Sequence, residues 1–295
     1  MAYAAGGALA AAVSRAGGLG LIGGGYGNAD WIEEQFEAAG GERVGIGFIT
    51  WSAAEQPSVV SAALQHQPAA VMLSFGDPTT FAAEIRSTEA LLICQCQNLT
   101  HVRAALDAGA DIVVAQGAEA GGHGASRGTF TLVPEVADML ARTSPDTLLV
   151  AAGGVADGRG LAAALALGAD GVLIGTRLCA AQESLVKPRH KQAIVESDGD
   201  ATLRTHVPDI VRQLPWPHEF TARIGRNAFV NRWHGHESEL EEQASVVGPG
   251  YLRAFAEGDP EHTAVWFGEA AGLVDDVEPA ATIIERMVSN AAKAR

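Results

Sequence analysis

The feature that most constrains the fold of this chain is a regular alternation of short apolar runs with longer amphipathic stretches between residues 18 and 176. The apolar runs contain few polar residues, as expected for parallel strands that are buried on both faces. The stretches between them repeat apolar residues at helical spacing, as in Trp31, Ile32 and Phe36. This alternation predicts a βα barrel or a doubly wound sheet. The predicted strands span residues 18–23, 44–49, 70–75, 91–96, 111–115, 148–152 and 171–174.

An internal repeat supports this interpretation. The segment ALDAGAD (105–111) precedes one apolar run, and ALALGAD (164–170) precedes another. In each copy we expect a helix end, a glycine just past it, and then a strand. The copies lie about 60 residues apart, which corresponds to two βα units of roughly 30 residues. Repeated βα units favour a TIM-type (βα)8 barrel.

The strand count is one short of a complete barrel. The chain of 295 residues suits one barrel of roughly 250 residues with an insertion. Its start, however, is helix-like at residues 9–16 and precedes the first predicted strand. Either residues 1–5 form a stub of the first barrel strand, or Met1 is an internal methionine of the natural gene product. We favour the second interpretation, in which the first strand is largely missing or truncated.

The alternation stops after Leu185. Residues 186–265 are more polar and contain scattered prolines, so we predict a helical cap inserted after the last strand. The amphipathic stretch at 279–292 is expected to return as the last barrel helix. The predicted domains are therefore a barrel formed by residues 1–185 and 266–295 and a helical cap formed by residues 186–265.

Composition excludes several classes of protein. Apolar residues make up 47% of the chain, which excludes intrinsic disorder. The net charge of −15 argues against nucleic acid or an anionic membrane as a partner. The start of the chain lacks the basic segment of a signal peptide, and Arg15 interrupts any membrane span. Three cysteines cannot build a disulfide framework and lack zinc spacing, so we expect a cytoplasmic protein without a metal site.

Two glycine turns follow neighbouring predicted strands. Gly153 and Gly154 follow one strand, and Gly175 and Thr176 follow the next. Turn amides at the carboxyl ends of adjacent barrel strands form a common phosphate-binding arrangement. Ordinary turn glycines are the alternative for either site alone. The pair in this register predicts a phosphate site, and Arg177 next to it would bind either the phosphate or a neighbouring acid.

A second loop carries the main candidate for catalysis. The run QGAEAGGHG (116–124) follows an apolar strand and contains the only histidine of the nine that is embedded in glycines at a strand end. Glycines let the backbone lie against a flat ligand, and imidazole titrates near neutral pH. A surface-loop histidine is the alternative. Together with the phosphate turns, this loop predicts a functional His123.

Other residues give weaker signals. The alternation along 91–96 places Gln95 and Gln97 on one face and Cys94 and Cys96 on the other. If the glutamines face the barrel mouth, Gln95 can donate to a ring ligand, while the cysteines pack under helices. His234 and His236 are candidates for a metal site, with an ordinary cap surface as the alternative. Trp216, Trp233 and Trp266 are candidates for the cap–barrel cleft, with aromatic packing in the insertion as the alternative.

Four segments together resemble nitronate monooxygenases, formerly called 2-nitropropane dioxygenases. They are QGAEAGGHG (116–124), AAGGVADGRG (151–160), GADGVLIGTRL (168–178) and AAAVSRAGGLGLIGGG (10–25). The resemblance covers most of residues 7–185 and is looser through the predicted cap. Members of this family are FMN-dependent barrel enzymes that oxidise alkyl nitronates with O₂.

The resemblance implies a role for specific residues. His123 matches the catalytic histidine of the family, and Gln95 lies where the family contacts the pyrimidine edge of the flavin. Two departures weaken other contacts: only Met1 can match a family Pro-Met at the flavin, and Gly47 stands where many members carry asparagine. The remaining residues expected to bind FMN, at its ring or phosphate, are Gln116, Gly121, Gly122, Gly153, Gly154, Leu173, Ile174, Gly175 and Thr176.

The expected function is oxidation of alkyl nitronates to a carbonyl compound and nitrite, with FMN as the redox group. His123 would bind the nitronate oxygens or remove the α-proton of a neutral nitroalkane. Two alternatives stay open on sequence alone. One is an FMN-dependent reductase that uses NADH to reduce an enoyl-acyl-carrier substrate or a quinone. The other is a non-redox barrel that binds a different phosphate ligand.

Overall fold

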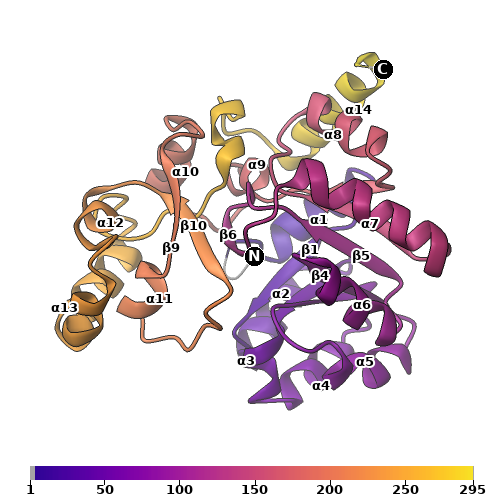
Figure 1. The fold of residues 1–295 in the computed structure, drawn as a ribbon, viewed down its shortest axis with the longest axis horizontal. Helices are drawn as coiled ribbons and strands as arrows, with labels where there is room; N and C mark the ends of the chain where they lie inside the picture. The colour runs from indigo at the N-terminus through magenta and orange to yellow at the C-terminus, as the bar shows by residue number, and fades with distance from the viewer. Residues whose placement is uncertain (1–3, 295) are drawn as a thin grey trace.

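The computed structural model describes residues 4–294, and its centre is a parallel sheet of seven strands. The strands follow one another in sequence order across the sheet, which curls so that helices cover its outer side (Figure 1). Each predicted strand is confirmed to within about three residues. The sheet contains, in spatial order, β1 (Leu21–Gly25), β2 (Gly45–Ile49), β3 (Ala70–Ser74), β4 (Leu91–Cys96), β5 (Ile112–Gln116), β7 (Leu148–Ala152) and β8 (Gly171–Leu173).

The helices that follow the strands bury their apolar stripes against the outer side of this sheet. Ile32 of α2, Ile85 of α5 and Leu132 of α7 are completely buried there together with Ile22 and Leu92 from the strands. Asparagine side chains cap the starts of α2 and α6. The helices of the barrel are α1 (Gly7–Arg15), α2 (Ala29–Ala39), α3 (Thr50–Ala54), α4 (Ser58–Leu64), α5 (Thr79–Arg86), α6 (Leu99–Asp107), α7 (Thr129–Thr143), α8 (Gly158–Ala166), α9 (Thr176–Cys179) and α14 (Ala280–Lys293).

The two edges of the sheet, β1 and β8, are not paired with each other in the described residues, so the sheet is a curled half barrel. The carbonyl of Ala5 accepts from the amide of Gly23 in β1, and the carbonyl of Ala4 accepts from the amide of Leu185. These contacts tie the start of the described chain to both ends of the barrel segment. The prediction about Met1 falls on residues 1–3, outside the described residues.

The internal repeat has a clear structural role. The carboxylate of Asp111, at the start of β5, accepts from the amide of Leu92 at 2.8 Å. The carboxylate of Asp170 accepts from the amide of Leu149 at the same distance. In both copies, the aspartate of the Gly-Ala-Asp segment accepts from the amide of the second residue of the neighbouring strand. The repeat therefore fixes strand register twice.

The inserted segment was predicted as a helical cap, and it contains two strands in addition to its helices. These strands pair with each other antiparallel, and β10 also pairs antiparallel with a short strand from the barrel, in the order β6-β10-β9. The partner β6 lies about 100 residues upstream of β10, so local sequence alone did not indicate this small sheet. Its elements are α10 (Pro188–Val195), β9 (Thr202–Thr205), α11 (Val207–Val211), β10 (Thr221–Gly225), α12 (Ala228–Trp233) and α13 (Glu237–Glu257), with β6 (Gly122–Gly124) joining from the barrel.

The insertion has a core of its own. Val207, Ile224, Val230 and Leu240 are fully buried within it around Trp233. The chain then returns to the barrel through a 3₁₀ turn at Glu269–Leu273 and ends in α14. Helix α14 packs on α8 and α1, as predicted for the last barrel helix (Figure 1). None of the helices within residues 4–294 is long and apolar enough to cross a membrane.

We expect Asp170→Ala to lower the free energy of unfolding by about 1 kcal/mol, because the amide of Leu149 loses a charge-assisted hydrogen bond. The double variant Asp111→Ala/Asp170→Ala should lose about twice as much, since the two sites lie on different strands. Urea midpoints followed by circular dichroism measure both losses. Asp138→Ala, on the exposed side of α7, is the control; equal midpoints for this control and the double variant would contradict the role of the repeat.

Candidate active site

The carboxyl end of β4 presents its glutamines and cysteines on opposite faces, as predicted. Ile93 lies in the inner cluster of the barrel, whereas Cys94 and Cys96 pack in the outer core under the helices. By alternation, Gln95 and Gln97 share the inner face with Ile93. Burial raises the pKa of the Cys94 thiol to about 12. These cysteines are therefore packing residues and not nucleophiles.

The inner face at the barrel mouth combines polar side chains with bare backbone. Ser74 pairs in register with Gln95, and Gln116 ends β5 on the same inner face. On the first two strands the inward positions are Gly23 and Gly47, which pair with each other across the parallel ladder. Both glycines are buried, and without side chains they let another group approach the backbone of β1 and β2 closely.

Three buried polar atoms gather where β2 and β3 end. Within the described residues, Thr50 Oγ1, Trp51 Nε1 and Ser74 Oγ have no hydrogen-bond partner. A buried polar atom without a partner costs about 1–3 kcal/mol, and natural structures contain few of them. Three such atoms at the mouth indicate a site that is completed by a bound molecule.

A chain of hydrogen bonds crosses the mouth from the outside to the candidate catalytic loop. Gln97 Nε2 donates to Gln116 Oε1 at 2.9 Å, and Gln116 Nε2 donates to the carbonyl of His123 at 3.0 Å. At the other end, the ring Nδ1 of His101 lies 3.0 Å from Gln97 Oε1. The predicted ligand residue Gln116 is thus fixed by its neighbours and holds the backbone of His123.

His123 lies on β6 and is buried at the junction of the barrel and the insertion. Its Nε2 lies 3.0 and 2.9 Å from the two carboxylate oxygens of Asp209 on α11. Arg212 Nη2 donates to the same carboxylate at 3.0 Å. Burial lowers the pKa of His123, against the effect of the Asp209 carboxylate, which raises it. Burial and the Asp209 carboxylate therefore act in opposite directions on the protonation of this imidazole.

Aromatic side chains from both parts of the chain surround this imidazole. The ring of Trp216 stacks on it with centroids 3.4 Å apart and planes 4° from parallel, and Trp266 lies 5.7 Å away. Phe75 lies edge-on to the imidazole and has a positive φ of 64°, which is strained for a residue other than glycine. Tyr26 accepts a hydrogen bond from Trp216 Nε1. The mouth is thus walled by aromatic rings.

The sequence left open whether the three tryptophans line the cleft or pack within the insertion, and it did not indicate the acid. Trp216 and Trp266 lie beside His123, whereas Trp233 belongs to the core of the insertion. Asp209 was not predicted, because it reaches His123 from 86 positions along the chain. No spacing motif links the two residues, so only the folded insertion brings them together.

The two glycine turns predicted to hold a phosphate lie next to each other. Ala152 pairs with Leu173, so the turns after β7 and β8 meet at the same edge of the sheet. Gly153 and Gly154 have positive φ angles of 101° and 75°. A side chain added at Gly175 would meet no atom within 4 Å. The second turn therefore leaves open space at the start of α9, where the first amides of a helix have no partner within the helix.

The other residues predicted to bind FMN also pack closely against the rest of the chain. A side chain at Gly121 would come within 2.5 Å of the amide of Gly268, and Gly122 has a positive φ of 76°. The hydroxyl of Thr176 accepts from the amide of Gly268 at 2.8 Å. Leu173 belongs to the inner cluster and Ile174 packs toward α1 and α14. The segment around Gly268 thus ties the candidate catalytic loop to the phosphate turn.

These residues fit FMN. The open glycine turns can receive a phosphate, the bare backbone of β1 and β2 can lie against a flat ring, and the glutamines and Ser74 supply polar partners at its edge. Each of these groups lies at the carboxyl ends of the strands, where barrel enzymes bind their ligands.

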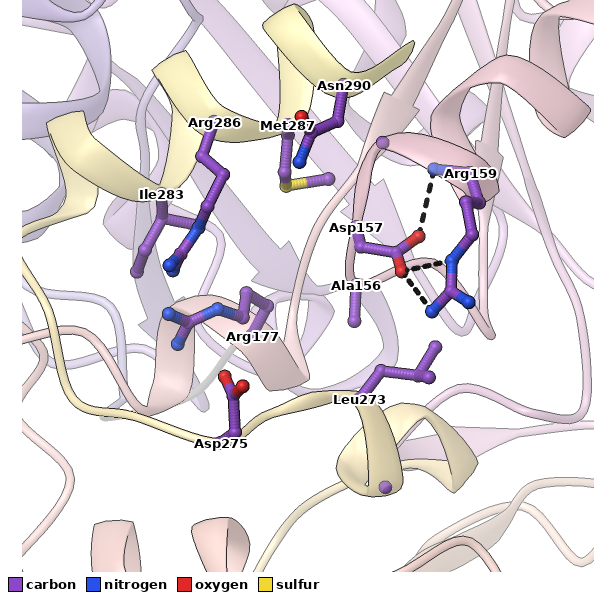
Figure 2. A pocket seen from close by; sticks show the side chains of 12 residues that line it. Ala156, Asp157, Arg159, Arg177, Leu273, Asp275, Ile283, Arg286, Met287 and Asn290 are labelled. Atoms are coloured by element: carbon purple, nitrogen blue, oxygen red, sulfur yellow. Dashed lines mark hydrogen bonds and ion pairs between the residues drawn. The ribbon is translucent and has the colours of Figure 1, made fainter. Parts of the chain in front are cut away.

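Arg177 binds acids and not the phosphate turn. It is buried, and its guanidinium pairs with Asp276 and with Glu278, which Arg286 of α14 also contacts. Figure 2 shows Arg177 beside Arg286 and Asp275 at the wall of a cavity of about 340 Å³ between α8 and α14. The sequence left two possible partners for Arg177, a phosphate or a neighbouring acid, and in the structure its partners are the neighbouring acids.

Metal-binding groups do not assemble in the described part of the chain: within it, no cluster of three or more His, Cys, Asp or Glu side chains could hold an ion. His234 lies on the surface of the insertion and is 3.5 Å from a carboxylate oxygen of Glu237.

Comparisons with known proteins agree on one family. The family model described as nitronate monooxygenase matches residues 49–290. A nitronate monooxygenase of Neurospora crassa is 32% identical over 96% of this chain and 85% of its own length. A nitronate monooxygenase of Metarhizium robertsii is 35% identical over 94% of this chain and 85% of its own length.

Solved structures are similar over almost the whole chain. FabK from Thermotoga maritima has a TM-score of 0.86 at 33% identity and covers 99% of this chain and 91% of its own. Nitroalkane oxidase from Streptomyces ansochromogenes has a TM-score of 0.81 at 26% identity, with coverage of 99% and 94%. With the family match and these relatives, the chain belongs to the nitronate monooxygenase family of FMN-dependent oxidoreductases.

Proposed function

We propose that this enzyme oxidises alkyl nitronates with O₂ to a carbonyl compound and nitrite, with His123 as the base or anion partner. The observation that carries this proposal is the buried His123–Asp209 pair at the barrel mouth, beside the glycine turns that fit a flavin phosphate. When bound, FMN supplies the electron transfer between the substrate and O₂. The protein binds and orients the cofactor and the substrate, and it removes the proton of a neutral nitroalkane.

Each group of residues has a separate task in this proposal. The amides around Gly154 and Gly175 hold the phosphate, and Gln95 and Ser74 meet the edge of the ring. His123 receives the α-proton of a neutral nitroalkane or donates a hydrogen bond to a nitronate oxygen. The Arg212 guanidinium, which pairs with Asp209 and lies 5.1 Å from the Trp266 ring, adds positive charge near an anionic substrate.

The aromatic wall favours a substrate with an apolar chain. The rings of Trp216, Phe75 and Tyr26 supply little hydrogen bonding beyond the bond between Trp216 and Tyr26. A substrate that presents one charged head and an alkyl body matches a cationic group among aromatic rings. The three cysteines are free thiols, which agrees with our expectation of a reducing, cytoplasmic setting.

A second candidate function is an FMN-dependent reduction that uses NADH. The similarity to FabK over nearly the whole chain supports it. Adding NADH without O₂ separates the two candidates: bleaching of the flavin absorbance supports the reductase. Uptake of O₂ with release of nitrite on adding a nitronate supports the proposed oxidase.

We expect His123→Ala to lower kcat/KM for nitroethane by about 10²–10⁴-fold, because a positioned base contributes an effect of that size. FMN content should stay unchanged, since the side chain lies beside the proposed ring site and not at the phosphate turns. Nitrite release and flavin absorbance measure the two effects. His262→Ala is a matched control, because His262 forms an exposed pair with Asp259 away from the mouth; turnover by His123→Ala at the control rate would refute the role.

We expect Gly175→Leu to weaken FMN binding by at least 10²-fold while the apoprotein keeps its thermal stability. The added side chain meets no protein atom near its Cβ, so it occupies the space proposed for the phosphate. Fluorescence titration with FMN measures the dissociation constant, and circular dichroism measures the melting temperature. Gly250→Leu, at an equally open position on exposed α13, should leave both values near those of the parent chain. Tight FMN binding by Gly175→Leu would contradict the assignment of the phosphate site.

A further inference from the structure

We propose that Asp209 is a positioning residue that binds Nε2 of His123 and leaves Nδ1 as the atom that meets the substrate. This inference rests on the proposed role of His123 and assigns a task to the inserted segment. The insertion would then supply part of the proton-transfer machinery, in addition to walling the barrel mouth.

The hydrogen-bond geometry defines which ring nitrogen carries the proton. A carboxylate only accepts, so the contacts of 3.0 and 2.9 Å from Asp209 require Nε2 to donate. The guanidinium of Arg212 donates to Oδ1 of the same carboxylate and balances its charge. In the neutral imidazole, the lone pair therefore lies on Nδ1.

Packing holds the ring in this orientation. Trp216 covers one face of the imidazole in parallel stacking, and the indole is itself held by the hydrogen bond to Tyr26. The side chains of His123 and Asp209 are only 7% and 4% exposed, so water does not compete for the contact. A ring with one face covered and one nitrogen bound cannot rotate freely, and the remaining nitrogen keeps a constant position.

The side chains that act on the protonation of His123 come from one element. Asp209 lies on α11, and Arg212 directly follows that helix. Asp209 favours the protonated imidazole, whereas Arg212 and burial oppose it. Removal of the Asp209 charge should therefore lower the pKa of His123 further.

The test compares two substrates of the FMN-loaded enzyme. Nitroethane must lose a proton to the enzyme, whereas ethyl nitronate is already deprotonated. We expect Asp209→Asn to lower kcat/KM for nitroethane on the order of 10²-fold. The value of kcat/KM for ethyl nitronate should change much less. In the pH dependence of kcat/KM for nitroethane, the rise on the acid side should move to lower pH. The reason is that His123 loses the carboxylate that favoured its protonated form. Asp209→Glu, which keeps the charge, should restore part of the activity. It should also return the acid side of this pH dependence toward its original position.

Asp259→Asn is the matched control, since it disrupts an exposed pair with His262 whose nitrogen–oxygen distance is 2.8 Å. A purely structural role for Asp209 would lower turnover of both substrates equally and leave the pH profile unshifted. That outcome would overturn the proposal. A loss of nitroethane turnover in His123→Ala, together with normal behaviour of Asp209→Asn, would refute the positioning role alone. No loss in His123→Ala would refute the proposed function instead.

A spectroscopic measurement keeps the inference testable if Asp209→Asn folds poorly. Nitrogen-15 NMR of the histidine rings in the full chain, with His123→Ala used to assign the signal, identifies the protonated nitrogen at pH values above the His123 pKa. We expect the Nε2–H tautomer in the parent protein. A resonance pattern for the Nδ1–H tautomer would overturn the proposal whatever the kinetics show.

Discussion

The arrangement at the barrel mouth depends on the antiparallel pairing of β6 with β10. His123 pairs with Ala222 in this ladder, so the backbone of the candidate catalytic loop is part of a sheet that belongs to the insertion. Two arginines from the same small sheet, the half-buried Arg204 and the buried Arg223, donate to the carbonyl of Ala118 and hold the loop a second time. Burial lowers the pKa of Arg204 to about 10, which still leaves it a cation at neutral pH. A glycine-rich loop that would be mobile alone is therefore held in one conformation.

Rigid placement of the loop explains how the polar groups of the barrel can be oriented in advance of a ligand. Gln116 donates to the carbonyl of His123 and accepts from Gln97, so its amide is oriented while one N–H and one oxygen lone pair are left for a ligand. Ser74 and Thr50, in contrast, keep buried hydroxyls without partners among the described residues. The cost of these groups falls on the ligand-free fold and is relieved by a bound molecule. A site of this kind lowers the stability of the ligand-free fold and raises the affinity for the ligand, which is common at functional sites.

Much of the barrel could be predicted from local sequence. Continuous apolar runs gave the seven parallel strands, and alternation placed Gln95 and Cys94 on opposite faces because the side-chain period of a strand is two. The adjacent glycine turns at Gly154 and Gly175 followed from the order of the βα units. The prediction of a helical cap missed β9 and β10, because these strands are short and β10 pairs with β6, far away in the chain.

The sequence by itself determined which backbone segments are strands and which turns end them, because those features depend on residues close together in the chain. Only the tertiary structure decided that Asp209 meets His123, that Trp216 stacks on its ring and that Arg177 pairs with Asp276. Those contacts join residues between 86 and 99 positions apart. They form only when the insertion and the last helix pack on the barrel, and the energy of that packing comes from the whole core, which no local pattern records.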